Sequence, residues 1–319
     1  MASTPHIPVM AREVTEALDT KDNGIYVDAT FGRGGYSRAI LEAARTRVYG
    51  IDRDPEAIAA GKKMAGEFGS RLKLLQGPFG AMDVLMAGEH VQKVDGVALD
   101  LGVSSPQIDN AERGFSFQND GPLDMRMSQS GPSAADAVNK LSERELADII
   151  HQFGEERHAR RVAKRVIEAR TEAPITRTRQ LAEIVRRAVP RSADGIDPAT
   201  RTFQALRIYV NDELGELQRG LAAAESLLKP KGRLAVVSFH SLEDRAVKEF
   251  LRRRSGTGPS LSRHVPVAND RGYAPSFRIL TRKPQLPTPE EMQRNPRARS
   301  AKLRVAERTD APVFRENAA

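Results

Sequence analysis

The stretch that decides the fold is Ile25-Tyr26-Val27-Asp28-Ala29-Thr30-Phe31-Gly32-Arg33-Gly34-Gly35-Tyr36. Its first three residues are β-branched or aromatic and predict a strand that ends at Asp28. A glycine-rich turn over 32–35 follows, and a helical pattern begins at Ser37. Strand, glycine turn and helix in this order are typical of a nucleotide-binding unit, in which the N-terminus of the helix faces an anionic group. The turn alone does not identify the ligand.

The same alternation of strands and helices continues along the chain. Pro55 opens the helix after the second strand, at a position that favours proline. Further strands are predicted at 47–51, 72–75, 94–101, 233–239, 277–281 and 301–307. Because helical segments separate the first four strands, the sequence predicts an α/β fold with a doubly wound, Rossmann-like sheet.

The strand pattern stops between the fourth and fifth strands. A loop rich in glycine, serine and proline is followed by a capping pair, Ser142 and Glu145, and then by basic helices at 155–170 and 178–189. We therefore expect an all-helical insertion, 108–198, within a discontinuous domain formed by residues 1–107 and 199–319. One long helix, 199–228, is expected to lead back to the sheet.

The charge of the chain is unevenly distributed. It holds 50 Lys and Arg against 42 Asp and Glu, a formal net charge of +8. Residues 151–191 carry 11 basic and 5 acidic side chains, and residues 252–308 carry 14 and 4. Two basic regions on one chain indicate a polyanionic partner, nucleic acid first, although solvated helix faces and a basic tail would give the same counts.

Composition excludes several classes of site. The absence of cysteine rules out disulfides, thiolate catalysis and cysteine-ligated zinc, and the six histidines show no paired spacing that predicts a metal site. No apolar run approaches the roughly 18 residues of a membrane span, and the first twenty residues lack the apolar core of a signal peptide. These features predict a cytoplasmic protein without a metal.

The glycine turn departs from the fingerprint of nicotinamide dehydrogenases. Ser37 stands where the third glycine is expected, and Asp28 precedes the turn. A carboxylate there repels a pyrophosphate but suits a ligand with an ammonium and a sulfonium, such as S-adenosylmethionine. Asp52, 20 residues beyond Gly32, is placed to accept from ribose hydroxyls, and Phe79 offers an apolar surface to adenine. The alternatives are a turn-capping Asp28, a surface charge at Asp52 and a core position for Phe79.

The segment after the fourth strand, Asp100-Leu101-Gly102-Val103-Ser104-Ser105-Pro106-Gln107, borders the ligand crevice of such a sheet. An exocyclic amine of a nucleobase is a poor nucleophile because its lone pair is delocalised into the ring. Methylating it requires acceptors that pull on its N–H protons and hold the lone pair in line with the methyl–sulfur bond. Ser104 and Ser105, in a loop bent by Pro106, are the predicted catalytic, acceptor-positioning residues. The alternative is an ordinary serine-rich turn.

Ten motifs in one order make a more specific pattern than the turn. They are HIPV (6–9), DATFGRGG (28–35), GIDRDP (50–55), GPF (77–79), LDLGVSSPQ (99–107), RGFSF (113–117), GPLDMRM (121–127), TRTFQALR (200–207), SFHSLEDR (238–245) and NPRARS (295–300). Over nearly its whole length the sequence resembles the small-subunit ribosomal RNA cytosine-N4 methyltransferases, a bacterial family of class I S-adenosylmethionine-dependent enzymes.

The resemblance implies a class I methyltransferase sheet whose helical insertion recognises RNA. It also implies methylation of the N4 amine of a cytidine in the decoding region of 16S rRNA, on the small ribosomal subunit. The cofactor contacts that it implies fall on Gly34, Gly35, Tyr36, Asp52, Phe79, Asp100 and Gln107, to which the charge argument adds Asp28. Many members have histidine where this chain has Tyr36; a backbone contact survives that change, but a role of the imidazole does not.

Two further segments hold candidate substrate contacts. Phe115 and Phe117, with Arg126 nearby, are suited to stack on an extruded base, although a loop that packs its own aromatic rings would show the same residues. His240 is placed to contact the substrate beside the crevice.

Ser238, His240 and Asp244 invite comparison with a hydrolase triad. Three neighbours at one strand end cannot converge as a triad does. Ser241 and Asp244 are instead expected to cap the helix that follows. The residues therefore favour a helix start over a hydrolase.

Three other functions stay open. The first is a methyltransferase with a different acceptor, such as a DNA base or a protein side chain. The second is a non-catalytic RNA-binding or ribosome assembly factor on a methyltransferase scaffold. A dehydrogenase is the third alternative, against which Ser37 and Asp28 argue. The sequence also leaves the oligomeric state open, a homodimer included.

Overall fold

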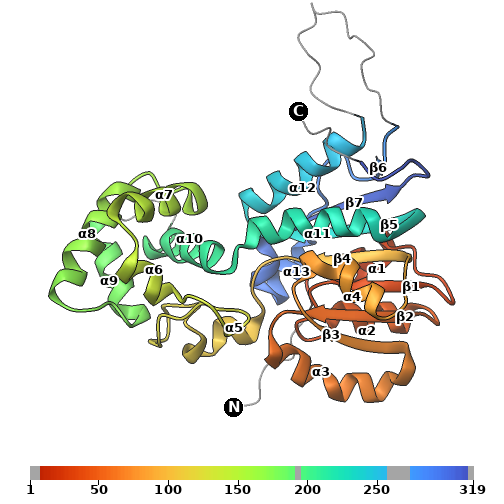
Figure 1. Cartoon of the computed structure of the whole chain (residues 1–319), viewed down its shortest axis with the longest axis horizontal. Helices are drawn as coiled ribbons and strands as arrows, with labels where there is room; N and C mark the ends of the chain where they lie inside the picture. Colours follow the sequence, from red (N-terminus) through yellow and green to blue (C-terminus); the bar gives the residue numbers. More distant parts are fainter. Residues whose placement is uncertain (1–7, 191–194, 257–273, 315–319) are drawn as a thin grey trace, which may run out of the picture. The chain divides into compact units, whose positions relative to one another are not determined.

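The computed structural model describes residues 8–190, 195–256 and 274–314. They form two compact units, one from Met1–Gly102 and Leu214–Ala319, the other from Val103–Glu213 (Figure 1). His6 and Ile7 of the first motif lie outside the described residues. The helical unit is therefore longer at both ends than the predicted insertion, 108–198.

The first unit is built on a seven-stranded sheet with strand order β3-β2-β1-β4-β5-β7-β6. The strands that pair along the first part of this order are parallel, whereas β7 runs antiparallel to both β5 and β6. The strands are β1 Ile25–Asp28, β2 Arg47–Asp52, β3 Leu72–Gln76, β4 Val94–Asp100, β5 Leu228–Ser238, β6 Phe277–Ile279 and β7 Lys302–Arg308. This confirms the predicted α/β fold with a Rossmann-like sheet.

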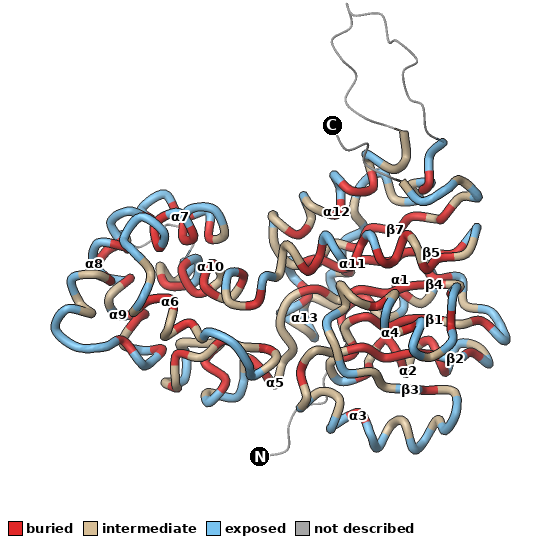
Figure 2. Tube along the Cα trace, in the orientation of Figure 1, coloured by how far each residue is buried: buried red, intermediate tan, exposed pale blue. Residues whose placement is uncertain are grey.

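Helices cover both faces of the sheet, because alternate side chains of each buried strand point to opposite faces. On β4, Val97 and Leu99 join one core, whereas Ala98 joins the other. Buried residues follow the strands and the inner sides of the helices (Figure 2). The helices are α1 Ala11–Ala17, α2 Gly35–Ala43, α3 Pro55–Phe68, α4 Met82–Gly88, α11 Glu213–Leu227, α12 Ser241–Arg254 and α13 Pro289–Arg294.

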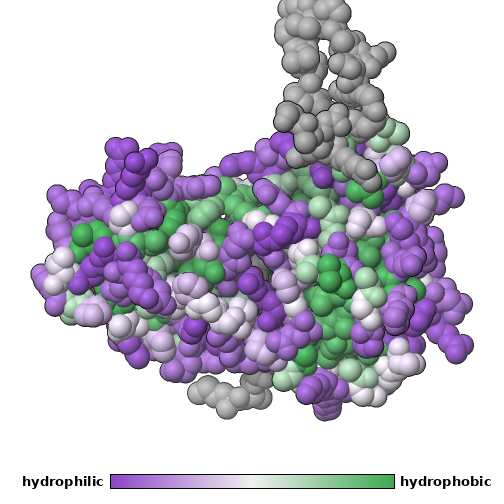
Figure 3. Space-filling model, in the orientation of Figure 1, coloured by the Kyte–Doolittle hydropathy of each residue, from purple (hydrophilic) through white to green (hydrophobic). Residues whose placement is uncertain are grey.

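Within its described residues the second unit consists of helices and the loops between them, with one isolated bridge between Pro122 and Arg177. Apolar side chains from its helices form one core, and the surface over α7 and α8 is mostly hydrophilic (Figure 3). Helices α5 and α6 were not predicted from the sequence; α6 begins with a capping box between Ser133 and Asp136. The helices are α5 Ser105–Asp109, α6 Ala134–Lys140, α7 Glu143–Gly154, α8 Ala159–Glu172, α9 Thr178–Ala188 and α10 Ala199–Asn211.

The prediction of one helix over 199–228 was wrong. Asp212 ends α10 in the left-handed conformation, with φ 48° and ψ 41°, and α11 starts at the next residue. A residue in this conformation stops a helix because the following N–H groups no longer meet the preceding carbonyls. Phe203 and Leu206 of α10 are buried in the helical core. Residues 199–213 therefore belong to the helical unit and not, as predicted, to the sheet domain.

Candidate active site

Asp28, the last residue of β1, fixes the start of α2. Its Oδ2 accepts hydrogen bonds from the Ser37 backbone N–H at 3.0 Å and from Ser37 Oγ at 2.7 Å. The turn between them is tightly packed, because a Cβ on Gly34 would stand 2.7 Å from Cζ of Phe31 and one on Gly35 2.5 Å from Cβ of Pro8. The turn-capping interpretation of Asp28 is therefore correct for Oδ2, and the glycines are needed for packing within the protein.

Asp52, at the tip of β2, ties that strand to the same turn. Its Oδ2 accepts from the Gly32 N–H at 2.7 Å, and its Oδ1 accepts from the Asp54 N–H at 2.8 Å. Burial raises the pKa of the Asp52 carboxyl despite these two hydrogen bonds. Asp52 is thus more than a surface charge, and its contact with a ribose stays a prediction.

Asp100 ends β4, the strand beside β1. Its N–H donates to Oγ1 of Thr30 at 2.6 Å. Burial, followed by the negative charge of Asp28, raises the pKa of Asp100 to about 8, although a hydrogen bond with Tyr36 opposes the shift. Burial also raises the pKa of Asp28 to about 6, against the hydrogen bonds from Ser37.

The two acids form a buried pair that lacks a cation. Oδ1 of Asp28 and Oδ1 of Asp100 are buried, and neither has a hydrogen-bond partner among the described residues. The groups that shift the two pKa values most include no Lys or Arg. Because a buried carboxylate is stabilised by an opposite charge, this donor set fits a ligand that carries positive charge.

The side chain of Tyr36 is committed to the fold. It is 4% exposed, and its hydroxyl donates to the Val9 carbonyl oxygen at 2.7 Å. Burial raises the pKa of the phenol well above its usual value. Only the backbone of Tyr36 is therefore left to meet a ligand at the turn.

Phe79 begins a short 3-10 helix, Phe79–Ala81, after β3. Its partly buried ring packs over Gly220 of α11, where a Cβ would stand 2.4 Å from Cδ2 of the ring. The next residue is held too, because the Gly80 N–H donates to Oε1 of Glu216 at 2.8 Å. One side of the ring is thus core filler, as one interpretation proposed, and the contact with adenine stays a prediction.

The predicted acceptor-positioning loop contains the start of α5. Ser104 is the N-cap of this helix, and its N–H donates to Oε1 of Gln107 at 2.9 Å in a capping box. Pro106 occupies the first turn, and Gln107 is 6% exposed. The segment is thus a capped helix start, which suits a loop that must hold Ser105 and its carbonyls in place.

His240 and Glu243 form the start of α12, and the predicted cap by Ser241 and Asp244 was wrong. Glu243 accepts from the Phe239 N–H at 2.8 Å and from the His240 N–H at 3.3 Å. Asp244 instead pairs with Arg304 of β7 at 2.6 Å. Sequence reasoning missed Glu243, although a glutamate three residues after the N-cap is the usual signal of a capping box.

The His240 side chain lies beside that glutamate. Its Nε2 is 3.0 Å from Oε1 of Glu243, and the side chain is 12% exposed. The side chain also takes part in the capping box, in which it accepts from the backbone N–H of Glu243. A contact between His240 and the substrate stays a prediction.

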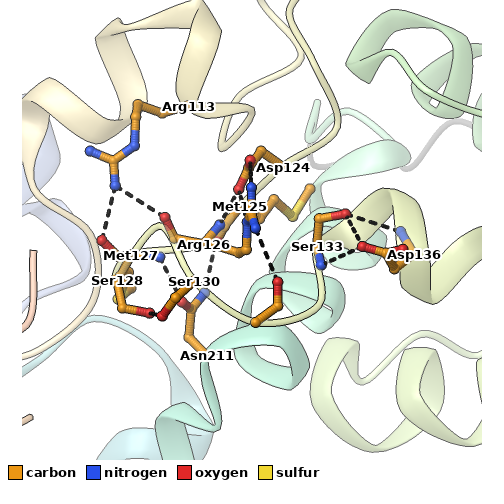
Figure 4. A network of polar contacts seen from close by, with 11 residues as sticks. Arg113, Asp124, Met125, Arg126, Met127, Ser128, Ser130, Ser133, Asp136 and Asn211 are labelled. Atoms are coloured by element: carbon orange, nitrogen blue, oxygen red, sulfur yellow. Dashed lines mark hydrogen bonds and ion pairs between the residues drawn. The ribbon is translucent and has the colours of Figure 1, made fainter.

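Phe115, Phe117 and Arg126 belong to a loop of the helical unit that is bound to itself. The Phe117 ring meets Phe203 edge-on at 4.9 Å, and Arg126 pairs with Asp124 at 2.6 Å. Figure 4 shows Arg113, whose guanidinium is 5.8 Å from the Phe115 ring centre, donating to backbone carbonyls of the same loop. The Phe117 ring thus packs on a neighbouring helix, α10, and the Phe115 ring lies near Arg113 of the loop's own start. Base stacking stays a prediction.

Residues 3–309 match the model of the MraW methylase family. The chain belongs to this family. Over 314 residues it is 60% identical to the Ribosomal RNA small subunit methyltransferase H of Paramagnetospirillum magneticum, covering 98% of this chain and 99% of that one. The protein of the same name from Rhodospirillum centenum is also 60% identical, over 98% and 95% of the two chains.

The solved structures that match this chain share less sequence identity with it. An rRNA methylase from Streptococcus thermophilus is 11% identical, with a TM-score of 0.41 and 94% of both chains covered. Within the described part of this MraW methylase, no helix combines the length and the apolar character that a membrane crossing requires. The cofactor of the methylase is S-adenosylmethionine, and the buried pair Asp28 and Asp100 fits its two positively charged groups.

Proposed function

We propose that this MraW methylase transfers a methyl group from S-adenosylmethionine to the N4 amine of a cytidine in the decoding region of 16S rRNA. The observation that carries the proposal is the 60% identity, over nearly the full length of both chains, to proteins named Ribosomal RNA small subunit methyltransferase H. Such a substrate places the enzyme in the cytoplasm with the small ribosomal subunit as its partner.

The residues at the carboxyl edge of the sheet support the cofactor half of this proposal. The bound cofactor supplies a methyl group on a sulfonium, which makes that carbon electrophilic. The N–H groups of Gly35 and Tyr36 face its carboxylate, and Gly34 contacts the cofactor beside them, since its own N–H donates to the Phe31 carbonyl. Asp28 and Asp100 balance the positive charges of the cofactor. Asp52 accepts from the ribose hydroxyls, Phe79 contacts the adenine, and Gln107 is the remaining predicted cofactor contact.

The acceptor half rests on the loop that opens α5. The amine nitrogen of cytosine gains nucleophilicity when acceptors hold its two N–H bonds and leave its lone pair directed at the methyl carbon. Ser104, Ser105 and the carbonyls around Pro106 take this role. Their capped geometry supports it, because a mobile loop loses the alignment on which the reaction depends.

The helical unit supports RNA recognition. Arg160, Arg161 and Lys164 of α8 are exposed, and within the described residues none of them forms an ion pair. Exposed, unpaired cations on one helix are suited to backbone phosphates, which provide most of the affinity of RNA-binding proteins.

The decisive experiment uses small ribosomal subunits isolated from a strain that lacks this gene. Purified protein and S-adenosylmethionine with a labelled methyl group are added, and the rRNA is digested to nucleosides. We expect label in N4-methylcytidine. Label in another nucleoside or in ribosomal protein would indicate a different acceptor, and no label together with no binding of S-adenosylmethionine would favour a non-catalytic assembly factor.

A further inference from the structure

The segment between α13 and β7 carries arginines that the fold does not use. Arg294 ends α13, and Arg299 lies in the 3-10 helix η4, Pro296–Ser300. Both side chains are exposed, and within the described part of the chain neither forms an ion pair. Glu290, one turn before Arg294 on α13, interacts with it electrostatically. An exposed guanidinium that no ion pair holds in place is available to an anionic partner.

This segment is firmly held and is not a loose basic tail. Oγ1 of Thr288 accepts from the Glu291 N–H at 3.2 Å and caps α13, and Oε1 of Glu291 accepts from the Met10 N–H at 2.7 Å. Ala298 and Ala301 are 0% and 1% exposed, in the same core as Tyr36. Because the backbone is already ordered, binding through these arginines costs mainly side-chain entropy.

The segment that carries the arginines leads into β7 at the functional edge of the sheet. β7 is antiparallel to β5, and its first residue, Lys302, pairs with Ser238, the last residue of β5. The residue before Ser238 pairs in turn with Asp100 of β4. The segment that ends at Ser300 therefore reaches the carboxyl edge, where the first unit holds its buried acids.

We propose that Arg294 and Arg299 bind backbone phosphates of the substrate RNA close to the nucleotide that is methylated. The inference rests on the proposed function, since it takes rRNA to be the substrate. Guanidinium groups bind phosphate oxygens through paired N–H donors, and an RNA strand whose base enters the active site must pass its phosphates along this edge. The sheet unit thus holds RNA with its own surface, in addition to the helical unit.

The test compares a double variant, Arg294→Ala/Arg299→Ala, with a matched control, Arg45→Ala/Arg47→Ala. The control removes two exposed arginines at the start of β2, on the opposite edge of the parallel strands. Binding to small ribosomal subunits from the gene-deletion strain and to naked 16S rRNA is measured between 0.05 and 0.5 M KCl. Two lost phosphate contacts should lower the slope of log affinity against log salt by roughly 1.4 and weaken binding on the order of tenfold at 0.1 M salt.

The control should keep the wild-type slope, and Arg294→Lys/Arg299→Lys should recover most of it. An unchanged slope in the alanine variant would overturn the proposal, as would weaker binding to subunits but not to naked rRNA, which would indicate a ribosomal protein as the partner. Calorimetry with S-adenosylmethionine checks the fold of each variant. Methyl transfer to subunits by the wild-type protein is measured in parallel. If it occurs, an unchanged slope contradicts only the role of Arg294 and Arg299, and not the proposed function.

Discussion

At the scale of single residues, the buried acids Asp28 and Asp100 predict that cofactor binding releases a proton. With a pKa of about 8, Asp100 is mainly protonated at pH 7, whereas Asp28, with a pKa of about 6, is mainly ionised. The charged and titratable groups acting on the pair are Asp52, Tyr36 and Glu243, none of which is a cation. A cationic ligand lowers both pKa values, so its affinity should rise with pH from about 6 to 8 and then level off.

Calorimetry in two buffers of different ionisation enthalpy measures this proton release. We expect roughly one proton at pH 7 for the wild type and a much smaller number for Asp100→Asn. The free energy of unfolding of the free protein should show the reverse trend. A carboxyl whose pKa is raised by folding stabilises the fold at pH values below its ordinary pKa. This contribution is lost as the pH rises towards 8. Binding without any exchange of protons would contradict the proposal that Asp28 and Asp100 bind a cationic ligand.

Tyr36 makes a second prediction at this scale. Tyr36→Phe removes the hydrogen bond to the Val9 carbonyl and should lower the free energy of unfolding by about 1–2 kcal/mol, as measured by urea denaturation. Affinity for S-adenosylmethionine should change less than about threefold, because the predicted contact uses the backbone. The change that remains comes from Asp100, whose pKa the Tyr36 hydroxyl lowers. A large loss of affinity without loss of stability would show that the hydroxyl itself takes part in the site.

At the scale of elements, the start of α12 shows where local pattern and structure part. Ser241 and Asp244 satisfy a capping pattern in the sequence, but Asp244 is drawn to Arg304, 60 residues away. Glu243 holds the helix start by accepting two backbone N–H groups. Glu243→Ala should therefore cost about 1–2 kcal/mol of stability, and Glu243→Gln, which keeps an acceptor oxygen, clearly less. Equal losses in thermal unfolding would mean that charge, and not the cap, matters.

The contrast between local patterns and long-range contacts also explains which elements can be predicted from the sequence. Buried strands such as β4 are visible because a continuous apolar run is a local feature. The end of α10 is not visible in the sequence. Asp212 adopts a left-handed conformation although it is not a glycine, and the helical spacing of apolar residues continues past it. In the candidate site, Asp28 and Asp52 can be predicted from their spacing to the glycine turn alone. The bond from Tyr36 to Val9 joins residues 27 apart and depends on how the N-terminal segment packs.

At the scale of the whole molecule, the positive charge lies in both units, which predicts that both contribute to RNA affinity. On α8, Arg161 is unpaired within the described residues, whereas Arg165 is 2.9 Å from Glu168. Both are exposed on the same helix. Arg161→Ala should lower the salt slope of RNA binding by roughly 0.7, and Arg165→Ala by less, because Glu168 already neutralises its charge.

Combining variants tests whether the two units hold one RNA together. If α8 and the Arg294–Arg299 segment contact phosphates of the same bound RNA, the slope changes of the variants Arg160→Ala/Arg161→Ala/Lys164→Ala and Arg294→Ala/Arg299→Ala should add, because the sites share no partner. The five charges together predict a decrease of roughly 3.5, measured on small subunits by titration with salt. A combined variant no weaker than the α8 variant alone would confine RNA binding to the helical unit, and the sheet unit would then receive only the extruded base.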